Sequence, residues 1–496
     1  MLFNSFAFGI FFTTVFILYW AFFNVHRVKT RNLYLFIVSC VFYGWWDYRF
    51  LFLIILSSLI DYLIGNFLYQ LNQIETPDKQ LKNTIKRKKK YALILSITFN
   101  IGVLCFFKYF NFFIDNLTNL LSLFHINFST PALNIILPVG ISFYTFQTLS
   151  YTIDLYKNEI KPAKDWIQFF AFVTFFPQLV AGPIERAQNL LPQFETLKKP
   201  NYHVFRKAIV TIAWGYFLKI MIADRLSVYV DSAYSDINKS NGLPILIGTI
   251  FFSFQLYFDF YAYSIIAKGT SYLMGFNLID NFKSPYTLSD SFANFWKRWH
   301  ISLSSWFKDY VYIPLGGNKK GKRKTYLFLI LVFAVSGLWH GSTWNFVIWG
   351  FLNALFLIFL DPILIRLSSI LKHNITIYKT INRVIIFSFW SFSLIFFRSA
   401  NFNDALSIIS NIGFYNFNSI TNFNLNNSEL LFTLFLLFIV LSKELIWENR
   451  YKKIEETFYR KNQIIRIAFY CLLVLSIIYL GKYGSGNENS FIYFQF

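Results

Sequence analysis

Histidine is the side chain best suited to proton transfer near neutral pH, and the chain contains six histidines. His340 is unusual because it ends the apolar run LFLILVFAVSGLWH and is followed by the short polar stretch Gly341 to Thr343. An ionisable side chain within a membrane span is costly, so we interpret it first as functional and otherwise as a histidine packed against a backbone carbonyl. Four others lie beside polar residues in expected loops or span ends and are interpreted as surface residues: His26, His125, His203 and His373.

The sixth histidine, His300, lies in the segment SPYTLSDSFANFWKRWHISLSSWFKDYVYIPLGG at 284–317. Ser291 or Asp290 can cap a helix here, and Pro314 with the two following glycines would end it. Apolar residues then recur at a spacing of three to four, which predicts one amphipathic helix over 291–313 at the membrane interface, lining access to His340. The stripe consists of Phe292, Phe295, Trp299, Leu303, Trp306 and Tyr310. In such a helix His300 is either a catalytic residue or a polar residue at the interface.

Other polar residues within apolar segments are expected to have structural roles. The carboxylates are Asp61, Asp154, Asp224 and Asp259, and we expect pairs with lysines such as Lys219 or Lys268 and between Asp224 and Arg225. The three cysteines, Cys40, Cys105 and Cys471, have no metal-binding spacing, so we expect free thiols and no metal site. No HExxH, GxSxG, P-loop or GxGxxG motif occurs, which disfavours serine hydrolysis and ATP-driven transport.

The elements that must position these residues are membrane helices. Of the 496 residues, 55% are hydrophobic and only 14% are charged, and a bilayer core needs about 20 apolar residues for each helix. The apolar segments predict one all-α polytopic membrane domain over 1–496, with about eleven transmembrane helices plus re-entrant or interfacial pieces. The predicted segments are 7–24, 33–46, 50–70, 91–113, 134–153, 166–182, 206–223, 243–263, 325–340, 343–365, 382–397, 429–446 and 464–481.

The net charge of +21 is concentrated in three basic clusters, near 26–31, 79–90 and 319–324. Each cluster adjoins an apolar segment, so the positive-inside rule explains them better than nucleic-acid binding does. If 26–31 is cytoplasmic, the N-terminus begins outside and two spans bring 79–90 back to the cytoplasm. We therefore expect all three clusters to be cytoplasmic.

Two long blocks resemble the membrane-bound O-acyltransferase (MBOAT) family, in the subgroup that includes the membrane subunit of alginate O-acetylation. They are NFWKRWHISLSSWFKDYVYIPLGGN at 294–318 and SGLWHGSTWNFVIWG at 336–350, within a signature region over 284–350. Further blocks match at 137–156, 175–187, 281–286 and 396–406. The block YFDFYAYSIIAKG at 257–269 departs from the family pattern: Asp259 is kept, but Ile265 replaces a usual acidic residue and Lys268 is unusual.

The resemblance implies an MBOAT-type bundle around a central tunnel, with His340 and His300 as catalytic residues. It implies no tightly bound cofactor, acetyl-CoA as the cytoplasmic acyl donor and a polysaccharide acceptor reached from the opposite side. A helix from Thr325 to His340 would be about 23 Å long at 1.5 Å per residue, which carries His340 deep into the membrane. Burial keeps an imidazole neutral and able to take the proton of an attacking hydroxyl. The expected substrate- or tunnel-lining residues are Trp299, Trp306, Asp309, Trp339 and Asn345.

The resemblance also predicts surroundings and partners. It implies a multi-pass protein of the bacterial cytoplasmic membrane, in contact with lipid and with a periplasmic or extracellular SGNH- or esterase-like acetyltransferase. D-alanyl transfer to teichoic acid from a carrier protein and O-acetylation of peptidoglycan remain alternatives within the family. The IPLGG sequence at 313–317 favours the alginate-like branch. A transporter or non-catalytic scaffold is the alternative from another class, but no internal repeat supports transport.

Overall fold

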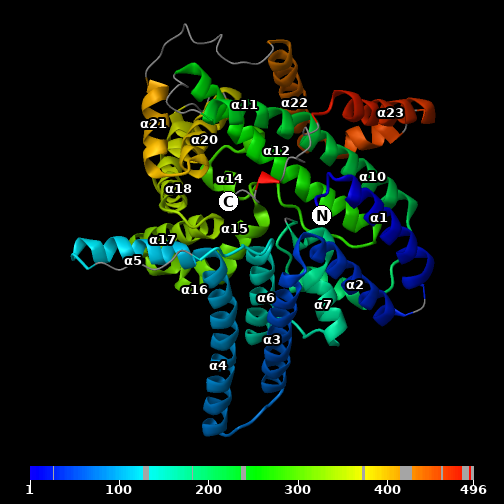
Figure 1. Cartoon of the computed structure of the whole chain (residues 1–496), viewed down its shortest axis with the longest axis vertical. Coiled ribbons are helices and arrows are strands. Elements are labelled where there is room, and N and C mark those ends of the chain that lie inside the picture. The colour runs from blue at the N-terminus through cyan, green and yellow to red at the C-terminus, as the bar shows by residue number, and fades with distance from the viewer. Residues whose placement is uncertain are drawn as a thin grey trace. The chain divides into compact units, whose positions relative to one another are not determined.

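The computed structural model describes residues 1–25, 27–126, 133–180, 182–235, 242–370, 375–413, 427–459, 462–482 and 491–492. Within these ranges the regular structure is helical and no strand occurs (Figure 1). The chain forms two compact units: residues 1–210 with 267–279, and residues 211–266 with 280–496. His26 and His373, which the sequence placed at the surface, lie outside the described residues.

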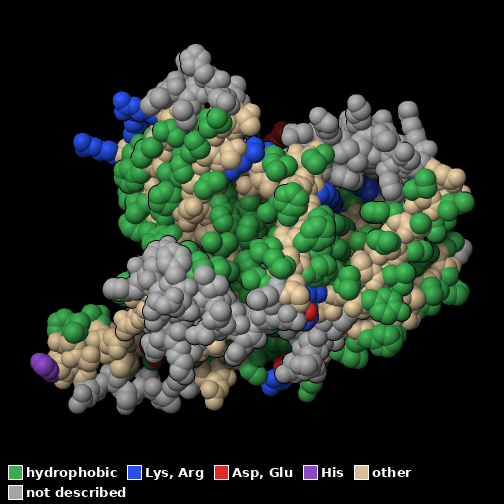
Figure 2. Space-filling model, turned by 90° about the horizontal axis from the view of Figure 1, so that it is seen from above, with side chains coloured by type: hydrophobic (Ala, Val, Ile, Leu, Met, Phe, Trp, Pro, Cys, Tyr) green, Lys and Arg blue, Asp and Glu red, His purple; other side chains and the backbone are tan. Residues whose placement is uncertain are grey.

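Seven helices in the described part of the chain are long and apolar enough to cross a membrane. Their outward-facing side chains are largely hydrophobic, and Figure 2 shows such side chains over much of the visible face. These features confirm the all-α polytopic membrane fold, whereas the number of eleven spans remains a prediction. The seven helical stretches are Phe6–Phe23, Arg49–Asn72, Lys79–Leu123, Leu243–Leu273, Trp344–Leu367, Thr376–Arg398 and Gln463–Leu480.

In the first unit, helices α3 (Arg49–Asn72), α4 (Lys79–Leu104) and α6 (Ile141–Tyr156) pack around a buried carboxylate. Asp61 of α3 accepts hydrogen bonds from Ser96 Oγ at 2.5 Å, from Asn100 Nδ2 at 2.9 Å and from Thr152 Oγ1 at 3.3 Å. Hydroxyl and amide donors thus take the place of the lysine that the sequence suggested as a partner for this carboxylate.

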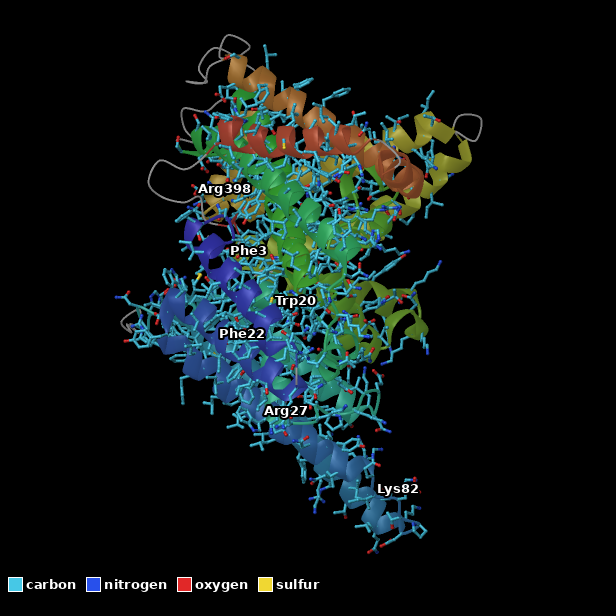
Figure 3. All side chains as sticks on the ribbon, turned by 90° about the vertical axis from the view of Figure 1, so that its right-hand side faces the viewer. Phe3, Trp20, Phe22, Arg27, Lys82 and Arg398 are labelled. Atoms are coloured by element: carbon cyan, nitrogen blue, oxygen red, sulfur yellow. The ribbon has the colours of Figure 1, made fainter. Side chains whose placement is uncertain are left out.

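Two predicted cytoplasmic clusters lie toward one end of this first unit. Arg27 precedes α2 (Val28–Asp47), and Lys82 lies in the first turn of α4. Figure 3 shows Arg27 and Lys82 toward the same end of the unit and Phe3 toward the other. The cytoplasmic location of these clusters remains a prediction.

The second unit contains α12 (Leu243–Leu273, up to Ile266), α17 (Lys322–His340), α18 (Trp344–Leu355) and α20 (Ile375–Arg398). Its short helices α14 (Phe292–Trp296) and α15 (Ile301–Phe307) replace the single helix predicted over 291–313, so that prediction was wrong. Ser291 caps α14 as expected, since its side chain accepts the Asn294 backbone N–H. The chain is then interrupted at His300, and after α15 it continues as a π-helix over Lys308–Tyr312 and a last turn over Ile313–Leu315.

The predicted apolar stripe is packed inside the protein. Phe292, Phe295, Trp299, Leu303 and Trp306 are all buried. Trp299 packs against Trp390 of α20, with ring centroids 4.7 Å apart. The break between the two helices is therefore accommodated within a protein core.

Candidate active site

His340 occupies the last position of α17, where the helix gives way to a short connection into α18. Only 5% of its surface is exposed. Three aromatic rings surround the imidazole, with centroid distances of 4.9 Å to Trp339, 5.0 Å to Trp349 and 5.4 Å to Phe397. The described surroundings of His340 are thus mainly aromatic.

The two helices that flank His340 approach each other at glycines. A Cβ atom at Gly337 would lie 2.1 Å from the Phe346 carbonyl oxygen, and one at Gly350 would lie 2.1 Å from the Phe333 carbonyl oxygen. Small residues at such crossings allow helix backbones to touch, as is common between membrane helices. The sequence SGLWHGSTWNFVIWG therefore places its histidine at the end of a tightly crossed helix pair.

His300 sits at the break between α14 and α15 in a left-handed conformation, with φ 41° and ψ 55°. This conformation is uncommon for a residue with a Cβ atom. The side chain is 1% exposed, and its ring packs edge-on against Phe260 at 4.6 Å. Burial lowers the pKa of His300 well below its ordinary value, so the imidazole is neutral near pH 7.

Asn281 holds His300 from a segment of chain nineteen residues earlier. Its Oδ1 lies 3.1 Å from His300 Nδ1 and accepts the Ser302 backbone N–H at 3.2 Å and the Ser302 hydroxyl at 2.9 Å. The Ile301 N–H donates to the Asn281 carbonyl at 2.9 Å, and the Lys283 N–H donates to the Arg298 carbonyl at 3.0 Å. Side-chain and backbone hydrogen bonds together fix the left-handed turn.

The two histidines predicted from separate blocks come together in the structure. Their ring centroids are 6.5 Å apart with an interplanar angle of 61°, and Trp339 contacts both rings. One small group hydrogen-bonded to both imidazoles would fit the scale of this separation. A neutral imidazole can take a proton from a hydroxyl group, and the catalytic roles of both histidines remain predictions.

The other predicted site residues lie at varying distances from this pair. Asn345 is buried and donates to the Ser399 carbonyl at 3.0 Å, while Trp299 packs on Trp390 and Trp306 packs on Tyr310. Asp309 is partly exposed and forms an ion pair with Lys308 at 3.4 Å. Trp339 contacts both histidine rings, and the lining roles of all five residues remain predictions.

Comparisons with known proteins bear on the family of this chain. The model of MBOAT, the membrane-bound O-acyltransferase family, matches residues 160–397, which include both histidines. The peptidoglycan O-acetyltransferase of Helicobacter pylori is 31% identical over 94% of this chain and 91% of its own length. This chain belongs to the membrane-bound O-acyltransferase family.

Further relatives within this family differ in their named substrates. The probable alginate O-acetylase AlgI of Pseudomonas putida and that of Pseudomonas aeruginosa are each 37% identical, over 65% and 71% of this chain. The chain spans 63% and 64% of the lengths of those two proteins. The teichoic acid D-alanyltransferase of Bacillus subtilis is 30% identical over 45% of this chain and 59% of its own length.

The block at 257–269 that departs from the family pattern includes part of a buried charge cluster. Lys219 Nζ lies 2.8 Å from Asp224 and 2.8 Å from Asp259, which confirms the predicted pairing of Lys219 with intramembrane carboxylates. Asp259 also accepts the Ile492 backbone N–H at 2.8 Å. The expected pair between Asp224 and Arg225 is wrong, since the Arg225 guanidinium binds Glu429.

Sequence reasoning did not assign Asn281, Phe260 or Trp349 to this MBOAT site. Asn281 is the first residue of the block NFKSPY, which the sequence analysis noted. Its contact with His300 could not be predicted, because it depends on the left-handed turn at His300. Trp349 follows His340 by nine positions, and the close crossing of α17 and α18 brings the two rings together. Phe260 lies on α12, and no spacing in the sequence connects it with residue 300.

Proposed function

We propose that this protein is the membrane subunit of an O-acetylation system, which transfers an acetyl group to a hydroxyl of a cell-surface or exported polysaccharide. The proposal rests on one observation: in a chain of the MBOAT family, two buried histidines lie with their ring centroids 6.5 Å apart. The named activities of the relatives, O-acetylation and D-alanylation, are both acyl transfers to hydroxyl groups. The proposal places the protein in a bacterial cytoplasmic membrane.

In the proposed reaction His340 is the general base. Its neutral imidazole takes the proton of the acceptor hydroxyl as the oxygen attacks the carbonyl carbon of an acetyl thioester. The tetrahedral adduct then collapses, the carbon–sulfur bond breaks and the thiolate leaves with the proton returned by the imidazolium. His300 accepts a hydrogen bond from the acceptor and orients it.

Acetyl-CoA is the proposed donor, entering from the cytoplasmic side. The basic residues of 319–324 lie just before α17 and in its first turn, and His340 is the last residue of the same helix. Positive charge there would attract the phosphates of CoA. The same residues also fit the positive-inside rule, which explains the cluster without any donor. Activity with acetyl-CoA and none with an acylated carrier protein is the expected result of an assay of the two donors.

The acceptor is proposed to lie on the opposite side, where an SGNH- or esterase-like partner completes transfer to the polymer. A second acceptor, peptidoglycan, is favoured by one observation: the Helicobacter pylori relative is aligned over 94% of this chain. The D-alanyltransferase relatives are aligned over less than half of it.

The test is chemical analysis of the cell envelope with and without the gene. Alkali-labile acetate would be measured separately in secreted or surface polysaccharide and in purified peptidoglycan, and ester-linked D-alanine in teichoic acid. Loss of acetate from polysaccharide, restored by the wild-type gene and not by His340→Ala, is the expected result. Loss confined to peptidoglycan would select the second acceptor, and loss of D-alanine alone would refute acetyl transfer.

A further inference from the structure

The identity of the Asn281 side-chain atom that faces His300 follows from a backbone group. A backbone N–H can only donate a hydrogen bond, and the Ser302 N–H points at this atom from 3.2 Å. The atom must therefore be the carbonyl oxygen of the amide and not its nitrogen. The opposite end of the amide agrees, because Nδ2 faces the Ser264 hydroxyl at 3.3 Å.

This identity determines where the neutral imidazole of His300 carries its proton. An amide oxygen has no proton to donate, so His300 Nδ1 at 3.1 Å can bond to it only as a donor. In the neutral ring a proton on Nδ1 leaves the lone pair on Nε2. The Ser302 hydroxyl also lies 3.5 Å from His300 Nδ1, but it donates its proton to Asn281 Oδ1 at the shorter distance of 2.9 Å. The choice of tautomer is thus made by Asn281, which is itself held by Ser302 and Ser264.

We propose that Asn281 is a positioning residue that locks His300 in the Nδ1–H tautomer, so that Nε2 is the nitrogen that accepts a proton or hydrogen bond during acyl transfer. The catalytic part of this inference rests on the function proposed above, whereas the tautomer itself does not. The left-handed turn at His300 serves the same end, because it brings the ring and both Ser302 donors to one oxygen.

The tautomer can be measured without any activity assay. Protein labelled with ¹⁵N-histidine would be studied in lipid nanodiscs by NMR, and the His300 signals identified by their loss in His300→Gln. We expect the His300 proton on Nδ1 in the wild type and a mixture of tautomers in Asn281→Leu. A wild-type His300 protonated on Nε2 would overturn the proposal, whatever reaction the protein catalyses.

The pH–rate profile tests the positioning role in catalysis. In Asn281→Asp the carboxylate still accepts all three hydrogen bonds but adds a negative charge beside Nδ1, which stabilises the imidazolium and raises its pKa. Since the imidazolium has no lone pair on Nε2, the acid limb of the rate profile should move to higher pH. Asn281→Leu should instead lower kcat by about 10-fold to 100-fold at every pH, with a smaller change in KM.

Asn382→Asp is the matched control for the added charge. Asn382 is also a fully buried asparagine of the second unit, but its amide donates to the Asp290 carbonyl and not to a histidine. It should leave the acid limb in place. An acid limb that moves equally in both Asp variants, or that stays unchanged in Asn281→Asp, would refute the positioning role. If no variant has acyltransfer activity because the proposed function is wrong, the NMR result still decides the tautomer.

Discussion

The two histidine regions hold their side chains by different means. Among the contacts described for them, His300 is distinguished by hydrogen bonds to Asn281 at a left-handed turn, and His340 by aromatic packing at the end of a tightly crossed helix pair. Hydrogen bonds determine which ring nitrogen carries the proton and how the imidazole is turned. Packing determines only where the imidazole lies. The comparison implies that the His300 region is sensitive to polarity and backbone conformation, and the His340 region to volume.

The largest expected effect is that of His340→Ala. Loss of a general base typically lowers a rate by about 10²–10⁴-fold. We expect O-acetylation to fall by that factor while the protein remains in the membrane at a near-normal level, as checked by acetate release and immunoblotting. Full activity at normal expression would exclude His340 as the base, and disappearance of the protein would assign it a structural role.

Gly337→Ala should be the next most damaging change and would test the role of volume. The added Cβ would lie 2.1 Å from the Phe346 carbonyl oxygen, so α17 and α18 must separate and His340 must move. We expect a clear loss of folded protein by size-exclusion chromatography in detergent and at least about a 10-fold loss of activity. Gly102→Ala is the control, since nothing lies within 4 Å of its Cβ, and it should be neutral or stabilising. Equal behaviour of the two variants would remove the case for a tight crossing.

Substitutions of His300 separate backbone conformation from chemistry. Asparagine tolerates the left-handed region better than most residues, so His300→Asn should accumulate better than His300→Val. The difference in unfolding free energy should be about 1–2 kcal/mol. Both variants should lose activity, but less than His340→Ala does. Equal thermal stability of the two variants, measured by intrinsic fluorescence, would show that the turn at His300 does not constrain residue type.

The smallest expected effect is on the pH dependence of stability. The pKa of His300 is lowered in the folded protein by burial, relative to an ordinary value of 6.5. As the pH falls below 6.5, the unfolded state binds a proton that the folded state does not, so stability falls with pH by up to about 1.4 kcal/mol per pH unit. The melting temperature of the wild type should therefore decrease more between pH 7 and pH 5 than that of His300→Asn. Parallel curves for the two proteins would contradict the burial of a neutral histidine.

The sequence predicted the local features of this site better than its tertiary contacts. The apolar run ending at His340 and the cap at Ser291 are patterns within one segment, and the structure has both. The apolar stripe was predicted for a helix at the membrane interface, and five of its six residues are instead buried in the protein. The break at His300 was not predicted because residues 291–313 have helical periodicity throughout. It arises because hydrogen bonds to Asn281 outweigh the local helix preference.

The partners of buried charged residues were also predictable only in part. The association of Lys219 with Asp224 and Asp259 was predictable, because a lysine and carboxylates in apolar segments need one another. Asp61 was not, because hydroxyl and amide groups on two other helices satisfy it and ordinary polar residues carry no distinctive signal.

The glycine contacts between α17 and α18 also bear on how the protein can move during turnover. Where two backbones already touch, one helix cannot slide past the other or rotate inward without a steric collision. His340 lies where α17 ends and the chain turns into α18, so its position should stay the same while substrates bind and leave. Any opening that admits a donor or releases a product must therefore come from other elements of the chain, and cross-links between α17 and α18 should leave turnover intact.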